Sequence, residues 1–330
     1  MKKIRTVLSV LSGSFLMASP LVAQEVGEYG YLQLPVSAHA AALGGTSISV
    51  VEPEAALAEQ NAALLCPEME GQISLSYMNY VSDVNLMYGS YTGSFLVDGG
   101  WQVGVRCLSY GDFEGYDADG NATGTFGARD VALSYGVGYP INDRWRIGAF
   151  ARALYSKYES NTAFALGVDV GLNYYNEASG RSISMVLTNL GGQLSSLSSS
   201  RRCSLPTQLS IGITKEVEHL PFCFSLTAEQ LFDWKHSYVD ASGALHKYSG
   251  GEQLLNHLLL GVEWLAVDNF YLAAAYSYRR QREFSGDGGF LRGLSLGAGL
   301  TWRQFGCQIS YASYNAIDGS LLVGVSYKWK

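Results

Sequence analysis

The chain has 330 residues and a formal net charge of −7, and only 15% of its residues are charged. A sparsely charged, acidic chain has no electrostatic footprint for nucleic acid. The 38 Gly and 22 Tyr are high counts for a soluble enzyme and typical of a β-rich membrane protein.

The first 23 residues are predicted to be a secretory signal peptide. Lys2, Lys3 and Arg5 precede an apolar run over 7–21, and the small-residue site Val22-Ala23 follows. The alternative is an N-terminal membrane anchor, but the apolar run is short and ends in small residues. After it, no run approaches 18 apolar residues, so no membrane-spanning helix is expected. An exported chain that is half apolar without such a helix indicates a closed barrel.

Residues 24–70 are predicted to be a plug inside that barrel. The stretch 31–65 is the only long segment that does not resemble part of a hairpin. Its small residues from Ala38 to Gly45 suit close packing against an inner wall. A lumen much wider than that of an eight-stranded barrel cannot be filled by side chains alone. We therefore expect this segment to occupy it.

Residues 71–330 are predicted to form an all-β, 14-stranded antiparallel transmembrane barrel. Apolar and polar residues alternate with period two, as in Phe164, Leu166 and Val168 against Ala165 and Gly167. Connections alternate between short turns, expected on the periplasmic side together with both termini, and longer loops such as 111–128, expected outside. The expected strands are 73–81, 84–97, 100–110, 129–140, 144–157, 162–175, 180–190, 206–215, 221–233, 256–265, 269–280, 291–303, 305–315 and 320–329.

Charged strand residues mostly fall on the predicted inner phase. On the lipid face a mid-membrane Arg would cost roughly 2–4 kcal/mol. Inside, these charges either pair to fill the lumen or form a selectivity ring for a solute. The predicted lumen charges are Arg106, Arg146, Arg152, Asp169, Glu229, Glu263 and Arg303.

No residue set indicates catalysis, a cofactor or a metal. The five Cys are scattered without paired spacing. Asp117, Asp119 and Asn121 resemble the start of a calcium loop, but Ala122 and Ala128 stand where an EF-hand needs Gly and Glu. No nucleophile lies in a recognisable context, and no phosphate-cradling Gly loop is present. The chain is therefore not expected to be an enzyme.

The predicted plug contains Leu34-Pro35, Ser37-Ala38-His39 and Leu43-Gly44-Gly45, followed by Asn61 and Leu64. This pattern resembles the plug of the PorV/PorQ family, relatives of the FadL-type outer-membrane barrels that occur in type IX secretion systems of Bacteroidetes. Weaker matches along the barrel include Asp112-Phe113, Asp169-Val170-Gly171 and Leu205-Pro206. FadL-type plugs usually carry Asn-Pro-Ala, whereas Ala62 follows Asn61 here, which relaxes a fixed φ. The plug residues that carry the resemblance are Leu34, Pro35, Ser37, Ala38, His39, Leu43, Gly44, Gly45, Asn61 and Leu64.

This resemblance implies a non-enzymatic outer-membrane component of a surface attachment complex. Its partners would be a PorZ-like surface protein, with PorU and PorV in the same complex, and the complex would link secreted cargo to lipopolysaccharide. The outer loops would be the docking surface, since Trp, Tyr and Arg are favoured interface anchors. The alternatives are a FadL-like passive channel for a hydrophobic solute and a porin-like structural barrel. The candidate docking residues are Trp234, Tyr238, Arg279, Arg280, Arg282 and Phe284.

Overall fold

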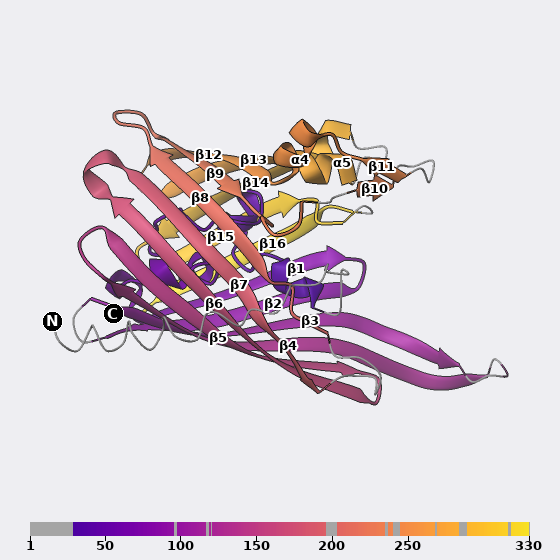
Figure 1. The fold of residues 1–330 in the computed structure, drawn as a ribbon. Helices are drawn as coiled ribbons and strands as arrows, with labels where there is room; N and C mark the ends of the chain where they lie inside the picture. The colour runs from indigo at the N-terminus through magenta and orange to yellow at the C-terminus, as the bar shows by residue number, and fades with distance from the viewer. Residues whose placement is uncertain are drawn as a thin grey trace, which may run out of the picture.

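The computed structural model describes residues 29–329 except 96–97, 117–118, 120, 196–202, 235–236, 240–244, 268, 284–288 and 316–317. The predicted signal peptide, residues 1–23, lies outside the described residues. Antiparallel strands close into a barrel in the order β1-β16-β15-β14-β13-β12-β9-β8-β7-β6-β5-β4-β3-β2 (Figure 1). The prediction of a closed, 14-stranded antiparallel barrel is confirmed.

Each barrel strand lies where the alternating pattern predicted one, with differences at the ends. In chain order the strands are β1 (Gln72–Val81), β2 (Val84–Ser94), β3 (Gly100–Tyr116), β4 (Ala122–Pro140), β5 (Trp145–Tyr158), β6 (Asn161–Asn176), β7 (Arg181–Ser195), β8 (Gln208–Glu216), β9 (Phe222–Ala228), β12 (Leu258–Val267), β13 (Phe270–Ser277), β14 (Leu294–Trp302), β15 (Phe305–Ala312) and β16 (Ser320–Lys328).

The outer face of the barrel is apolar and its inner face is small or polar. On β6, Phe164 and Leu166 are 52% and 51% exposed, whereas the neighbouring Ala163 and Ala165 are buried. Aromatic pairs join neighbouring strands near the barrel's rim, such as Trp145 with Tyr174, whose ring centroids are 5.1 Å apart. An apolar band with aromatic residues at its edge is the surface that a bilayer requires.

The two ends of the barrel differ. At the short-turn end, connections such as 141–144 and 303–304 are only a few residues long. The first and last strands also meet there, because the Trp329 backbone N–H donates to the Gly71 carbonyl at 2.8 Å. The opposite, long-loop end carries β10 (Ser237–Val239), β11 (Leu245–Lys247), α4 (Gly250–Asn256), α5 (Tyr278–Glu283) and the 3₁₀ helix η5 (Gly289–Gly293).

Several predicted boundaries at the long-loop end are wrong. Most of the expected loop 111–128 continues β3 and β4, which pair as far as Tyr116 and Ala122. This hairpin extends well beyond its neighbours in Figure 1. The ninth strand ends at Ala228 rather than at residue 233, and residues 278–280, expected in a strand, begin α5.

The described N-terminal segment, residues 29–70, lies inside the barrel (Figure 1, indigo); we call it the inner segment. α2 packs against β13, β14, β15 and β16, and η2 packs against β4, β5 and β6. No helix among the described residues is long and apolar enough to cross a membrane. The elements of the inner segment are η1 (Gly30–Gln33), α2 (Ala38–Ala42), α3 (Ala55–Ala58), η2 (Ala62–Leu64) and η3 (Pro67–Met69).

Glycines of the wall allow the inner segment to approach it closely. A Cβ on Gly148 would lie 2.2 Å from the carbonyl carbon of Ala62, and one on Gly138 would lie 2.3 Å from its oxygen. A Cβ on Gly171 would lie 2.0 Å from Asn61 Oδ1. Any larger residue at these positions would overlap the inner segment, so the wall is shaped to hold it.

Candidate functional site

The inner segment turns sharply around α2. Ser37 caps the helix: its Oγ accepts from the Ala40 backbone N–H at 3.2 Å and donates to Glu54 Oε1 at 2.7 Å. After the helix, Gly44 and Gly45 have φ of +97° and +98°. This left-handed backbone favours glycine, so the Gly-Gly pair is explained by the turn that brings the chain back into the lumen.

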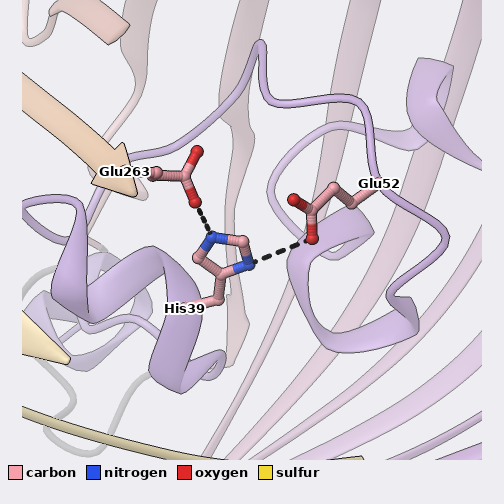
Figure 2. A group of neighbouring side chains, drawn as sticks. All are labelled: His39, Glu52 and Glu263. Atoms are coloured by element: carbon pink, nitrogen blue, oxygen red, sulfur yellow. Dashed lines mark hydrogen bonds and ion pairs between the residues drawn. The ribbon is translucent and has the colours of Figure 1, made fainter. Parts of the chain in front are cut away.

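His39 on α2 lies among three carboxylates, and we call His39, Glu52, Glu54 and Glu263 the His39 cluster. Figure 2 shows His39 with Glu52 and Glu263. His39 Nδ1 is 3.1 Å from Glu54 Oε2 and 3.5 Å from Glu52 Oε2. Its Nε2 contacts Glu263 Oε1 on β12. The ring stacks on Tyr271 of β13 at 4.1 Å. One face and both nitrogens of the imidazole are thus held, and His39 is fully buried.

The charges of the cluster shift its acid–base equilibria. Burial by itself lowers the pKa of His39, but Glu263 and Glu52 outweigh this effect and hold that pKa well above its usual value. Burial raises the pKa of Glu52 to about 7, against the pull of the His39 imidazolium. The cluster therefore holds a protonated imidazole in competition with more negative charge than it can neutralise.

A second buried group, the Arg152 network, joins the inner segment to β5 and β6. Arg152 donates from Nε to Asp169 Oδ2 at 2.6 Å and from Nη1 to Glu59 Oε1. Its Nη2 also reaches the Glu59 carbonyl at 3.2 Å. Tyr88 on β2 donates to Glu59 Oε2 at 2.9 Å. Arg152 and Asp169, predicted as lumen charges, therefore meet a carboxylate of the inner segment.

Two more arginines hold backbone carbonyls of the inner segment. Arg106 Nη1 donates to the Leu32 carbonyl at 2.9 Å. Arg280 Nη2 donates to the Gly44 carbonyl at 2.7 Å, and its guanidinium lies 5.0 Å from the Tyr314 ring centroid. Arg280 is only 9% exposed. Its predicted place on an outer docking surface is wrong, because α5 turns this side chain into the lumen.

The remaining predicted lumen charges lie near the barrel's ends. Arg146 is half-buried, with its guanidinium 5.7 Å from the Tyr175 ring centroid. Glu229 accepts from Thr46 Oγ1 of the inner segment at 2.7 Å. Arg303 is exposed in the turn after β14 at φ +57°, stacked over Trp302. Its prediction as a lumen charge is wrong, because the turn takes it out of the strand alternation.

The other candidate docking residues lie at the long-loop end. Trp234 is 48% exposed and packs 4.4 Å from the His257 ring. Arg279 pairs with Glu283 at 2.7 Å within α5, and Arg282 reaches Glu252 of α4 at 3.4 Å. Tyr238 lies on β10. Phe284 lies outside the described residues.

The other residues of the predicted plug motif shape the inner segment. Asn61 caps η2 by accepting from the Ala63 N–H at 3.0 Å, and its Nδ2 donates to the Ile48 carbonyl at 2.8 Å. Leu64 packs with Leu65, Met69 and Phe150 toward the short-turn end, and Leu43 packs with Leu57. Pro35 and Ala38 are buried, and Leu34 is half-buried.

A cavity of about 700 Å³ remains between the inner segment and the long-loop end. Aromatic side chains from several strands line it, together with arginines and carboxylates of the loop region. Its walls are therefore apolar with a few charged groups, which is the usual character of a site for a small molecule. Among its lining residues are Tyr31, Tyr80, Tyr110, Phe113, Tyr158, Tyr314, Arg279, Arg280, Glu229 and Glu283.

Sequence reasoning missed the acidic residues of the inner segment. The sequence did not identify Glu52, Glu54 or Glu59 as site residues. It did identify their partners, which are His39 for Glu52 and Glu54 and Arg152 for Glu59. A signal was present, because carboxylates are unexpected in a buried segment of small apolar residues unless each has a partner. The inner-phase cations of the wall were the available partners.

Replacing Ser37 with Ala should destabilise the inner segment moderately. The change removes the cap of α2 and a hydrogen bond to Glu54, and loss of such a cap costs about 1 kcal/mol. Urea unfolding of the refolded barrel, followed by Trp fluorescence, would measure it. Ser37→Thr, which keeps the hydroxyl, is the matched control; equal stability of Ser37→Ala and wild type would contradict the assigned role.

Comparisons with known proteins identify the fold but not the family. No protein-family model matches the chain, and no curated protein does. Among solved structures, the "TodX monoaromatic hydrocarbon channel deltaS2 mutant" superposes with a TM-score of 0.55 at 12% identity, covering 90% of this chain and 100% of that one. A Pseudomonas aeruginosa FadL homologue gives a TM-score of 0.48 at 10% identity, with 87% and 96% covered.

The fold is therefore a closed antiparallel β-barrel like that of the TodX channel. At 12% identity the likeness establishes architecture alone.

Proposed function

We propose that this chain is a non-enzymatic outer-membrane component of a type IX secretion system, of the PorQ kind. In this role the barrel anchors a surface complex that links secreted cargo to lipopolysaccharide. The observation that carries the proposal is that buried ionic groups fasten the inner segment to two separate parts of the wall. They are the His39 cluster at β12 and the Arg152 network at β5 and β6.

If the inner segment moved to open the lumen, it would have to break its contacts in both the His39 cluster and the Arg152 network. Breaking a buried ion pair by freeing one partner costs about 3–5 kcal/mol, because an uncompensated charge stays buried. The close contacts of Gly138, Gly148 and Gly171 with the inner segment add shape complementarity to the ionic groups. These features favour a fixed stopper, and a barrel that is permanently closed serves better as an anchor than as a channel.

In the proposed orientation the signal peptide 1–23 directs export and both termini lie in the periplasm. Residues 24–70 form the plug and 71–330 the barrel. The long-loop end then faces the outside, and α4, α5, β10 and β11 form the docking surface for a PorZ-like protein, with PorU and PorV in the same complex. The exposed Trp234 and the half-exposed Arg282 are of the residue types that dominate protein interfaces.

Capture of partners by a tagged barrel tests this proposal. Trp234→Ala combined with Arg282→Ala should lower recovery of the PorZ-like partner at least about tenfold in mild detergent, since a central interface residue often contributes more than 1.4 kcal/mol. Arg303→Ala is the matched control, because Arg303 lies over an aromatic ring, Trp302, as Arg282 lies over Tyr278, but at the short-turn end. Equal capture by both variants would overturn the assigned surface.

The cavity at the long-loop end supports a second candidate, a passive channel for a hydrophobic solute. Its volume of about 700 Å³ and its aromatic lining suit a small apolar molecule. The name of the TodX structure describes a monoaromatic hydrocarbon channel. Toluene uptake by vesicles that contain the purified barrel discriminates the two candidates: uptake with partner capture absent favours the channel, and capture without uptake favours the anchor.

A further inference from the structure

The His39 cluster carries more negative charge than its visible cation neutralises. Glu54 and Glu263 are buried, Glu52 is one-third exposed at its side chain, and His39 is fully buried. One imidazole thus faces three carboxylates, which offer more anionic oxygen atoms than a single cation can contact. Carboxylates buried without a partner are strongly unfavourable, so the cluster suits an added cation.

We propose that His39, Glu52 and Glu263 bind a divalent transition-metal ion of the Zn²⁺ class. One nitrogen of His39 and one carboxylate oxygen from each Glu lie within 4.8 Å of one another. Two ligand atoms on one tetrahedral zinc are about 3.4 Å apart, given bonds of about 2.0–2.2 Å. Glu263 already faces Nε2, and Glu52, which lies beside Nδ1, must turn its carboxylate toward Nε2 to close the set. Glu52 is the most exposed of the three, so its side chain is the one most able to turn.

The surroundings of His39 suit a metal ligand. Glu54 holds Nδ1 at 3.1 Å and is itself held by Ser37 Oγ at 2.7 Å, which leaves Nε2, directed at Glu263, as the ligand atom. A carboxylate on the second ring nitrogen is the usual support of a metal-bound histidine. Stacking on Tyr271 fixes the plane of the ring. Binding releases the Nε2 proton to solvent, as metal binding to imidazole requires.

The donor set points to the class of ion. An imidazole nitrogen suits Zn²⁺, Cu²⁺, Ni²⁺ or Fe²⁺, whereas Mg²⁺ and Ca²⁺ prefer oxygen ligands alone. His39 and Glu52 belong to the inner segment and Glu263 to β12. A bound ion would therefore join the inner segment to the wall, and metal occupancy would set how firmly the segment is held. This inference does not depend on the anchor role.

Calorimetric titration of the chelator-stripped, full-length barrel with ZnCl₂ tests the site. Wild type should bind one Zn²⁺ per chain, and His39→Gln and Glu263→Gln should each weaken binding about 100-fold or more. Glu229→Gln is the matched control: this carboxylate also joins the wall to the inner segment, through Thr46, but lies outside the cluster. MgCl₂ in place of ZnCl₂ should give no comparable heat.

Absence of zinc binding by wild type, or undiminished binding by both variants, would overturn the proposal. Heat-modifiable electrophoretic mobility reports whether each variant folds. If the variants do not fold, X-ray absorption at the zinc edge of the zinc-loaded wild type tests whether a histidine binds the ion. A spectrum with one imidazole among oxygen ligands supports the site, and a spectrum without imidazole refutes it.

Discussion

Arg152→Met is expected to lower the free energy of unfolding by about 3–5 kcal/mol. The guanidinium bridges Asp169 of the wall and Glu59 of the inner segment, and all three side chains are at least nine-tenths buried. Removing the cation leaves two buried carboxylates unpaired, which is among the most damaging single changes a protein can undergo. Urea titration of the refolded barrel, with folding read from electrophoretic mobility, measures the loss.

Two further variants show whether charge or geometry matters at this position. Arg152→Lys keeps the positive charge but loses the planar fork that reaches both carboxylates, so its stability should lie between those of wild type and Arg152→Met. Arg303→Met removes an exposed arginine and should change stability by less than about 0.5 kcal/mol. A stability of Arg152→Met within 1 kcal/mol of wild type would contradict the bridging role.

Gly148→Leu is expected to displace the inner segment from the wall. Even a Cβ at this position would lie 2.2 Å from a backbone atom of Ala62, and backbone cannot move aside as a flexible side chain can. Overpacking of this kind costs about 1–3 kcal/mol or more. The barrel's own strands should still pair. The displaced segment should become sensitive to protease, and single-channel conductance should appear where wild type shows none.

Gly127→Leu is the control for this experiment. A Cβ on Gly127 meets nothing closer than 3.7 Å, since this residue lies in the projecting part of the β3–β4 hairpin. It should leave protease resistance and conductance as in wild type. Conductance of wild type equal to that of Gly148→Leu would show that the inner segment does not close the lumen.

The strands could be predicted because one chemical rule governs them. Lipid on one side and a filled lumen on the other impose a period of two. On β6, outward and inward residues alternate without a break from Thr162 to Tyr174. The β3–β4 loop could not be predicted in this way. Its Gly, Asp and Asn residues indicate turns, yet the strands continue, with Phe113 and Phe126 stacked across the pair at 5.5 Å.

The interior could be predicted only in part. Alternation placed Arg152 and Asp169 on the inner face, but it contains no information about which residue of a non-repetitive segment meets them. Predicting the contacts of Glu54 and Glu59 requires the path of the inner segment. That path depends on the turn at Gly44 and Gly45. The position of Arg280 was predicted wrongly for a related reason. The chain changes from strand to helix at Tyr278, and this changes which side chains face inward.

The sequence separation of the inner segment from its partners constrains the order of folding. Glu59 and Arg152 are 93 positions apart, and His39 and Glu263 are 224 apart. Contacts so distant along the chain form slowly, because the entropy of closing the intervening loop is lost before they contribute. The inner segment is exported first, whereas Glu263, the ionic partner of His39, lies on β12 and is exported much later. The contacts of the inner segment therefore cannot all form until most of the barrel sequence has been exported.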